Sequence, residues 1–144
     1  MTEFFKDVPG KIIYEGRESD NPLSFKFYDK TKVIAGKTME EHLRFAVAYW
    51  HTFKGTGSDP FGNATMERPW DKSSDPLQRA KDTCDAAFEF VYKLDAPYYC
   101  FHDRDIAPEG ETFSKSCENL EALVEHAAIK QKETGIKLLW GTAN

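Results

Sequence analysis

The sequence has 144 residues, of which 40% are hydrophobic and 30% are charged. This composition is typical of one globular domain and excludes a disordered chain, which would contain too few hydrophobic residues to form a core. The net charge of −5 and the pI near 5.4 exclude a nucleic-acid-binding surface, which requires clustered Lys and Arg. The longest apolar run, at residues 45–50, is too short to cross a bilayer, and the first residues lack a signal-peptide pattern. We therefore expect a cytoplasmic protein that binds neither nucleic acid nor membrane.

The three cysteines are Cys84, Cys100 and Cys117, and none of them forms a Cys-x-x-Cys pair. An odd number without such pairs fits neither a disulfide framework nor a zinc ribbon. We expect all three to be reduced, buried thiols.

Residues 1–37 mix apolar and charged positions with turn-forming residues, which predicts an irregular N-terminal arm with short extended pieces such as residues 25–28. Thr38 followed by Glu41 resembles a capping box and predicts a short helical turn. The apolar run at residues 43–50 comes next, and its pattern is compatible with either a helix or a buried strand. A long loop rich in Gly and Pro follows at residues 54–69, and a loop of this length favours a functional role.

A first long helix is predicted to begin at Asp75, which can cap it, with Pro76 in the first helical position. Charged residues, Asp85 and Glu89 among them, are expected to face water. The apolar residues recur at three- and four-residue steps and form one stripe against the core: Leu77, Ala80, Cys84, Ala87, Phe88, Val91 and Leu94.

A strand is predicted at residues 97–101, and a second long helix runs from about Thr112 to Gly135. A further strand is predicted at residues 136–140. Because strands that alternate with helices pair in parallel through right-handed crossovers, the chain belongs to the α/β class. The buried stripe of the second helix is expected to comprise Phe113, Cys117, Leu120, Val124 and Ala127.

The carboxyl ends of parallel strands collect ligand-binding groups at one rim. His102 and Asp105 follow the strand at residues 97–101, three positions apart, so a turn can bring the carboxylate to the imidazole. A carboxylate that accepts one ring N–H leaves the other nitrogen able to transfer a proton. The same spacing also fits a surface turn in which Asp105 merely caps the next segment.

Trp50 and Trp140 would flank this pair if their strands are adjacent, and aromatic faces are a common support for sugars. Both are equally compatible with an ordinary core, and His51 beside Trp50 is ambiguous. His42 and His126 fall in predicted helices, where a solvated or capping role is expected.

Four motifs resemble the longer type of xylose isomerase. They are Tyr-Trp-His-Thr-Phe at residues 49–53, Gly-Ser-Asp-Pro-Phe-Gly at 57–62, Tyr-Cys-Phe-His-Asp-Arg-Asp at 99–105 with Pro-Glu-Gly at 108–110, and Lys-Leu-Leu-Trp-Gly-Thr-Ala-Asn at 137–144. The resemblance implies an α/β fold that is a partial TIM (β/α)8 barrel, with an arm at residues 1–37 and about three β/α units at residues 38–144.

The resemblance also implies an activity, the conversion of D-xylose to D-xylulose and of D-glucose to D-fructose. In that family the hydride shift depends on two divalent metals (Mg, Mn or Co), whose ligands lie on strands that would follow Asn144. We therefore expect the isolated chain to be inactive, since a metal must polarise the substrate oxygens. The full-length family forms homotetramers.

The family assigns roles to the matching residues. His102 would open the cyclic sugar by proton transfer, and Asp105 would orient it. Trp50 and Trp140 would line the sugar pocket.

Two further residues have implied roles. Thr142 would lie beside the substrate, and Phe61 would project into the site of a neighbouring subunit. One alternative is a non-catalytic sugar-binding or assembly fragment. Another is a different isomerase or an endonuclease-type relative of the same barrel fold, although the two tryptophans and the Phe61 loop argue against it.

Overall fold

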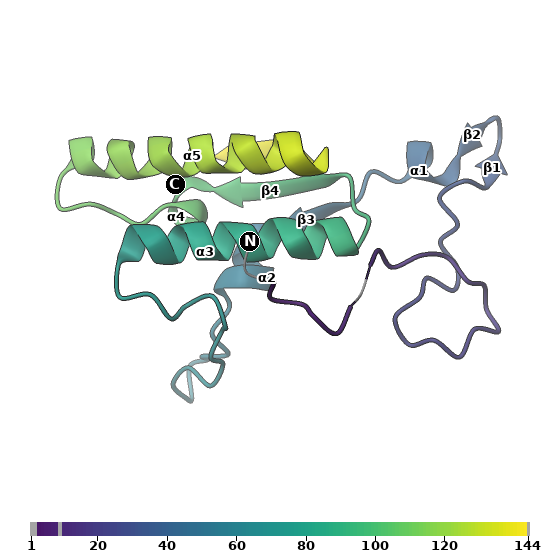
Figure 1. Ribbon diagram of the computed structural model, residues 1–144, viewed down its shortest axis with the longest axis horizontal. Helices are drawn as coiled ribbons and strands as arrows, with labels where there is room; N and C mark the ends of the chain where they lie inside the picture. The colour runs from purple at the N-terminus through teal and green to yellow at the C-terminus, as the bar shows by residue number, and fades with distance from the viewer. Residues whose placement is uncertain (1–2, 9, 144) are drawn as a thin grey trace.

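The computed structural model describes residues 3–8 and 10–143 (Figure 1). The described residues do not include 1, 2 and 9 of the expected arm (1–37), nor 144 of the expected β/α units (38–144). In chain order the elements are β1 (Val33–Ile34), β2 (Lys37–Thr38), α1 (Met39–His42), β3 (Ala46–Ala48), α2 (Tyr49–Lys54), α3 (Pro76–Lys93), β4 (Tyr98–His102), α4 (Asp103–Ile106), α5 (Phe113–Thr134) and β5 (Lys137–Thr142).

Three parallel strands form the main sheet, in the order β3-β4-β5. The long helices α3 and α5 connect them and lie side by side along the sheet (Figure 1). The expectation of an α/β fold with parallel strands is confirmed, and the arrangement is consistent with part of a barrel. Both predicted strands begin one residue too early, since β4 starts at Tyr98 and β5 at Lys137.

The apolar run at residues 43–50 is divided between two elements. β3 takes Ala46–Ala48, and α2 starts directly afterwards at Tyr49. The run therefore supplies both a short buried strand and the helix that follows it, whereas periodicity alone offered one or the other. The Thr38 capping box is present, because the Thr38 hydroxyl accepts from Glu41 N at 3.2 Å and Glu41 Oε2 accepts from Thr38 N at 2.6 Å.

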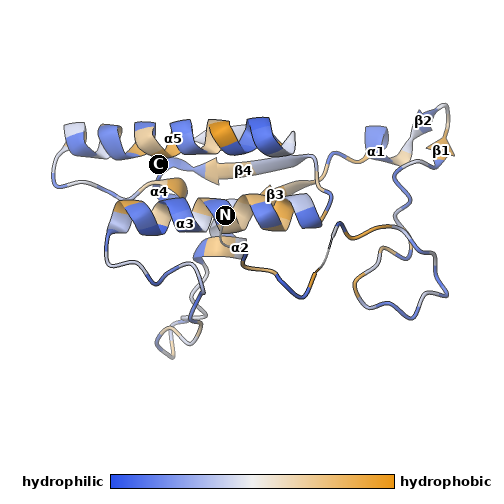
Figure 2. Cartoon of the chain, in the orientation of Figure 1, coloured by the Kyte–Doolittle hydropathy of each residue, from blue (hydrophilic) through white to orange (hydrophobic). Residues whose placement is uncertain are grey.

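Helix α3 has the cap and the buried face that the sequence predicts. Asp75 Oδ1 accepts from Leu77 N at 3.1 Å, and Pro76 occupies the first turn. Figure 2 shows apolar residues alternating with hydrophilic ones along α3. The expectation that Asp85 and Glu89 face water is wrong, because both carboxylates are partly buried and each accepts hydrogen bonds from another segment. The buried residues of α3 are Ala80, Thr83, Cys84, Ala86, Ala87, Phe88 and Val91.

The buried face of helix α5 differs from the predicted one. Leu123 and Ala127 are buried, whereas Phe113 is 86% exposed and Val124 and Cys117 are also exposed. The expected stripe is therefore wrong at three of its five positions. The helix lies beside the edge strand β5, and in the described part of the chain its helical neighbours are α3 and, over a smaller contact, the short helix α4. Its buried side also carries two polar residues, Asn119 and Lys130.

The arm is irregular, as expected, but it is tied to α3 and to the turn that follows. Glu89 Oε2 and Oε1 accept from the backbone N–H groups of Phe4 and Phe5 at 2.7 and 3.0 Å. Asp95, in the turn after α3, pairs with two lysines of the arm. The expected extended piece at residues 25–28 is wrong, since only Phe25 forms a bridge there.

Within residues 3–8 and 10–143, no helix combines the length and the apolar character that crossing a membrane requires.

Candidate active site

The centre of the candidate site is the last residue of β4. His102 ends the strand and caps α4, and Asp105 lies in the single turn of that helix. Asp105 Oδ2 accepts from His102 N at 3.0 Å and contacts His102 Nδ1 at 2.9 Å. Because an ionised carboxylate only accepts hydrogen bonds, the neutral ring carries its proton on Nδ1, and Nε2 is the acceptor. The Asp105 carboxylate therefore reaches the His102 imidazole, as their spacing of three residues predicts.

Two indoles lie against the imidazole. The centroid of the Trp50 ring, from α2, is 4.5 Å from that of His102, and the Trp140 ring, from β5, is 5.9 Å away. The two indoles are 5.6 Å apart. Three segments that are distant in the sequence therefore contribute one cluster of three rings, on the side of the sheet where His102 lies. An aromatic wall beside a proton-transfer group is able to hold the apolar C–H face of a sugar.

Thr142 is the register partner of His102 in the neighbouring strand, so the two residues lie next to one another at the carboxyl end of the sheet. His51 contacts Trp50 at a centroid distance of 5.8 Å but is itself exposed. Phe61 lies in the long loop between α2 and α3 and is 97% exposed. In the described part of the chain, no ring contact links Phe61 to the three-ring cluster.

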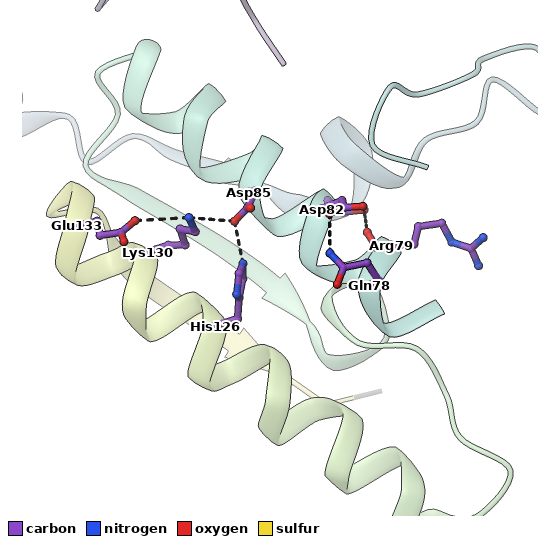
Figure 3. A network of polar contacts seen from close by, with 8 residues as sticks. Gln78, Arg79, Asp82, Asp85, His126, Lys130 and Glu133 are labelled. Carbon is purple, nitrogen blue, oxygen red and sulfur yellow. Dashed lines mark hydrogen bonds and ion pairs between the residues drawn. The ribbon is translucent and has the colours of Figure 1, made fainter. Parts of the chain in front are cut away.

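Two histidines outside this cluster have structural partners. His42 is exposed and its Nε2 contacts the Ile34 carbonyl at 2.8 Å. His126 is partly buried, and its Nε2 is 2.8 Å from Asp85 Oδ1 (Figure 3), so the expected solvated role is wrong for this residue. Lys130 Nζ lies 3.1 Å from the same Asp85 oxygen, and only 8% of its side chain is exposed. Asp85 thus joins α3 to α5 through two side chains.

The cysteines are only partly as expected. Cys84 and Cys100 are buried, but Cys117 is exposed, so the prediction of three buried thiols is wrong at that position. Burial, with the Asp85 carboxylate beside it, raises the pKa of the Cys84 thiol to about 12. Burial also raises the pKa of Cys100. Neither buried thiol is a thiolate near neutral pH, and the thiolate is the reactive form.

The candidate site does not extend to a metal site within the described residues. No three side chains of His, Cys, Asp or Glu come together there in a group that could hold a metal ion. The residues present therefore do not fit a two-metal centre.

Two residues near the cluster, Gly141 and Phe101, were missed by the sequence reasoning. Gly141 lies between Trp140 and Thr142, and an added Cβ there would come within 3.3 Å of the Phe101 ring. A glycine between two candidate site residues was the available signal.

The fold and the site define an α/β protein in which a His–Asp pair, walled by two indoles, lies at the carboxyl end of parallel strands. No family model matches the sequence. Comparison with curated proteins gives strong matches to xylose isomerases: 57% identity over 142 residues with that of Caldanaerobacter subterraneus subsp. yonseiensis, 54% over 144 residues with that of Thermotoga maritima, and 57% over 142 residues with xylose isomerase 2 of Xanthomonas campestris pv. campestris.

These matches cover 99–100% of the chain, so it belongs to the xylose isomerase family, as the motifs predict. The chain spans about a third of the length of the relatives, 32% in each of the first two named.

Proposed function

We propose that this chain forms the N-terminal part of a metal-dependent aldose–ketose isomerase that converts D-xylose to D-xylulose and also D-glucose to D-fructose. In this proposal, residues 1–37 are an arm and residues 38–144 are the first β/α units of a TIM barrel. Support comes from the identity of 54–57% with xylose isomerases over essentially the whole chain and from the parallel three-stranded sheet. The remaining units would be the part of the relatives that the chain does not span.

His102 would open the cyclic sugar. Its Nε2 accepts the proton of the anomeric hydroxyl and returns a proton to the ring oxygen as the bond between the anomeric carbon and that oxygen breaks, which yields the open-chain aldehyde. Asp105 would fix the tautomer that this step requires, because its Oδ2 lies 2.9 Å from His102 Nδ1 and would hold the proton on that nitrogen. The arrangement of His102, Asp105 and the two indoles is the observation that carries this proposal.

The other site residues would bind the sugar. Trp50 and Trp140 would pack against its C–H groups, and Thr142 would lie beside it as the neighbour of His102 across the strands. The nearly full exposure of Phe61 suits insertion into the site of a neighbouring subunit in a homotetramer.

The hydride shift of the family needs two divalent metals (Mg, Mn or Co), which polarise the substrate oxygens. Since the described residues do not provide a ligand group, the ligands would come from the part of the protein that the chain does not span. The chain by itself would then be inactive.

A chimera tests the proposal. The chain is joined at Asn144 to the remaining two thirds of the Thermotoga maritima relative, and xylose isomerisation is measured with each of the three metals. The chimera is expected to be active, and His102→Gln is expected to lower kcat by about 10²-fold or more because general acid–base catalysis contributes 10²–10⁴-fold.

His42→Gln is the matched control, since it makes the same change at an exposed histidine with a backbone partner. Full activity of the His102→Gln chimera would contradict the assigned role. The alternative of a non-catalytic sugar-binding fragment predicts that the 144-residue chain binds xylose by itself. Calorimetry distinguishes the two, because the isomerase proposal expects little or no heat of binding.

A further inference from the structure

Strand β5 contains one residue more than its partner strand. Leu138 pairs with Tyr99 and Trp140 pairs with Cys100, so Leu139 has no partner in β4. Tyr99 and Cys100 are consecutive and point to opposite faces of the sheet. Leu138 and Trp140 therefore also point to opposite faces, although they are two positions apart. Such a β-bulge re-aims the side chains that follow it.

The bulge decides which residues share the face of His102. After Leu139 the register is Trp140 with Cys100, then Gly141 with Phe101, then Thr142 with His102. An uninterrupted register would pair Trp140 with Phe101 instead and would turn the indole to the opposite face. The ring distances of 5.6 and 5.9 Å from Trp140 to the other two rings exist only in the bulged register.

The lack of a side chain at Gly141 permits this register beside the Phe101 ring. The Phe101 ring stacks on Tyr99 at 6.0 Å, and Tyr99 in turn contacts Phe88 of α3 and Gln131 of α5, so Phe101 is held on the helix-covered face. An added Cβ at residue 141 would lie 3.3, 3.5 and 3.7 Å from three atoms of the Phe101 ring. The nearest contact is tight enough that the Phe101 ring would have to shift by a few tenths of an ångström for a Cβ, and further for a larger side chain. The backbone of Gly141 is not in the left-handed region, so the constraint is steric.

We propose that Gly141 is a positioning residue: by leaving room for the Phe101 ring it permits the bulged register of β5, which turns Trp140 and Thr142 toward His102. This inference rests on the proposed function in one respect, namely that the indoles of Trp50 and Trp140 form a wall that binds the sugar. The register itself is tested without any sugar or activity.

The test uses the exciton couplet of Trp50 and Trp140 in the far-ultraviolet circular dichroism of the 144-residue chain. The parent chain should show a couplet that disappears in Trp140→Phe. Gly141→Val should lose most of the couplet while keeping its helical signal, and Gly141→Ala should lose less because it adds only a Cβ. The matched control is Gly10→Val, since nothing lies within 4 Å of a Cβ at that position.

Rescue makes the test specific. In a Phe101→Ala background, Gly141→Val should retain most of the couplet, because the ring that it would meet is absent. Absence of the couplet in the parent chain, an unchanged couplet in Gly141→Val, or failure of the rescue would each overturn the proposal.

A second readout separates this inference from the proposed function. In the active chimera, Gly141→Val should raise KM for xylose by a larger factor than it lowers kcat, because it displaces a binding wall while the His102–Asp105 pair stays intact. An inactive chimera would count against the proposed function alone, since the couplet would still report the register. Equal effects on kcat and KM would argue against positioning of the wall.

Discussion

The two long helices cover the same sheet in different ways. α3 has neighbours on both sides: α5 on one, and on the other α2 and the arm, where Phe90 contacts Phe5 and Phe53 at 5.5 and 5.6 Å. α5 lies at the edge, and its described neighbours leave Phe113, Val124 and Ile129 exposed. The apolar residues of a helix are thus buried only where a neighbouring segment covers them. At an edge, partnered polar residues occupy part of the buried side.

Removing a phenylalanine ring should have very different effects on stability in α3 and in α5. Phe88→Ala removes a buried ring of α3 that contacts Tyr99 at 5.0 Å, and it should lower the free energy of unfolding by about 3–5 kcal/mol. Phe113→Ala, the same change at the exposed start of α5, should change it by less than about 0.5 kcal/mol. Urea unfolding checks both values. Equal losses would show that α5 is covered in solution.

The polar contact between the helices comes next. Asp85→Ala leaves the Lys130 ammonium buried with only Glu133 at 3.5 Å, and it should lower the free energy of unfolding by about 1–3 kcal/mol. Glu118→Ala, which removes an exposed partner of Lys115, should cost about 0–1 kcal/mol. If both substitutions had the same small effect, the Asp85 contact would not stabilise the helix pair.

The stability that the Lys130–Asp85 contact provides should fall at alkaline pH. Burial acts to lower the pKa of Lys130, but the Asp85 and Glu133 carboxylates more than offset it and raise the pKa above its ordinary value. A raised lysine pKa gives stability that is complete below the ordinary value of about 10.4 and is lost as pH rises through the higher value of the folded protein. Unfolding measured from pH 7 upward should show this alkaline loss in the parent chain and a smaller loss in Asp85→Ala.

Attachment of the arm to α3 should be sensitive to acid. Burial acts to raise the pKa of Glu89, but the N–H groups of Phe4 and Phe5 together with Lys93 hold the pKa below its usual range. The stability is therefore present above the ordinary value of about 4.3 and is lost as pH falls through the lower folded value. Limited proteolysis should cut the arm more readily in acid.

Glu89→Gln should remove most of that acid dependence and cost about 1 kcal/mol at neutral pH. Glu125→Gln on the exposed side of α5 is the matched control and should change neither quantity. An arm that is equally protected in both variants would mean that Glu89 does not hold it.

The smallest effect concerns a hydroxyl near α3. Tyr49 is fully buried, its OH finds no hydrogen-bond partner among residues 3–8 and 10–143, and burial raises its pKa well above the usual range. Tyr49→Phe should increase the free energy of unfolding by about 1 kcal/mol, because an unsatisfied buried polar group is costly. Tyr92→Phe, at a partly exposed ring, should have little effect. A destabilised Tyr49→Phe chain would reveal a partner for the hydroxyl.

The sequence predicts α3 well because local chemistry determines it. Asp75 and Pro76 mark its start, and its apolar stripe meets a covered surface along its whole length. α5 could not be predicted in the same way, since the exposure of Phe113 and Val124 depends on what lies beyond the edge strand. The burial of Asn119 depends on the Pro108 carbonyl, which is 3.1 Å from its Nδ2 and is supplied by the loop between α4 and α5.

The candidate site also has one part that local sequence predicts and one part that depends on packing. The His102–Asp105 contact follows from a spacing of three residues at the end of a strand, so it could be predicted. The meeting of Trp50 with Trp140 depends on the division of residues 43–50 between β3 and α2 and on the unpaired Leu139 of β5. Neither feature has a periodic signature, because both are set by packing between segments.

The two hydrogen bonds to Asp105 Oδ2 come from the backbone and the ring of one residue. The backbone contact holds the Asp105 carboxylate in place, so the imidazole cannot rotate about χ1 without breaking the ring contact to that oxygen. Its rotational entropy is lost during folding and would not be lost again on binding of a ligand. The orientation of the ring is thus a property of the folded chain itself.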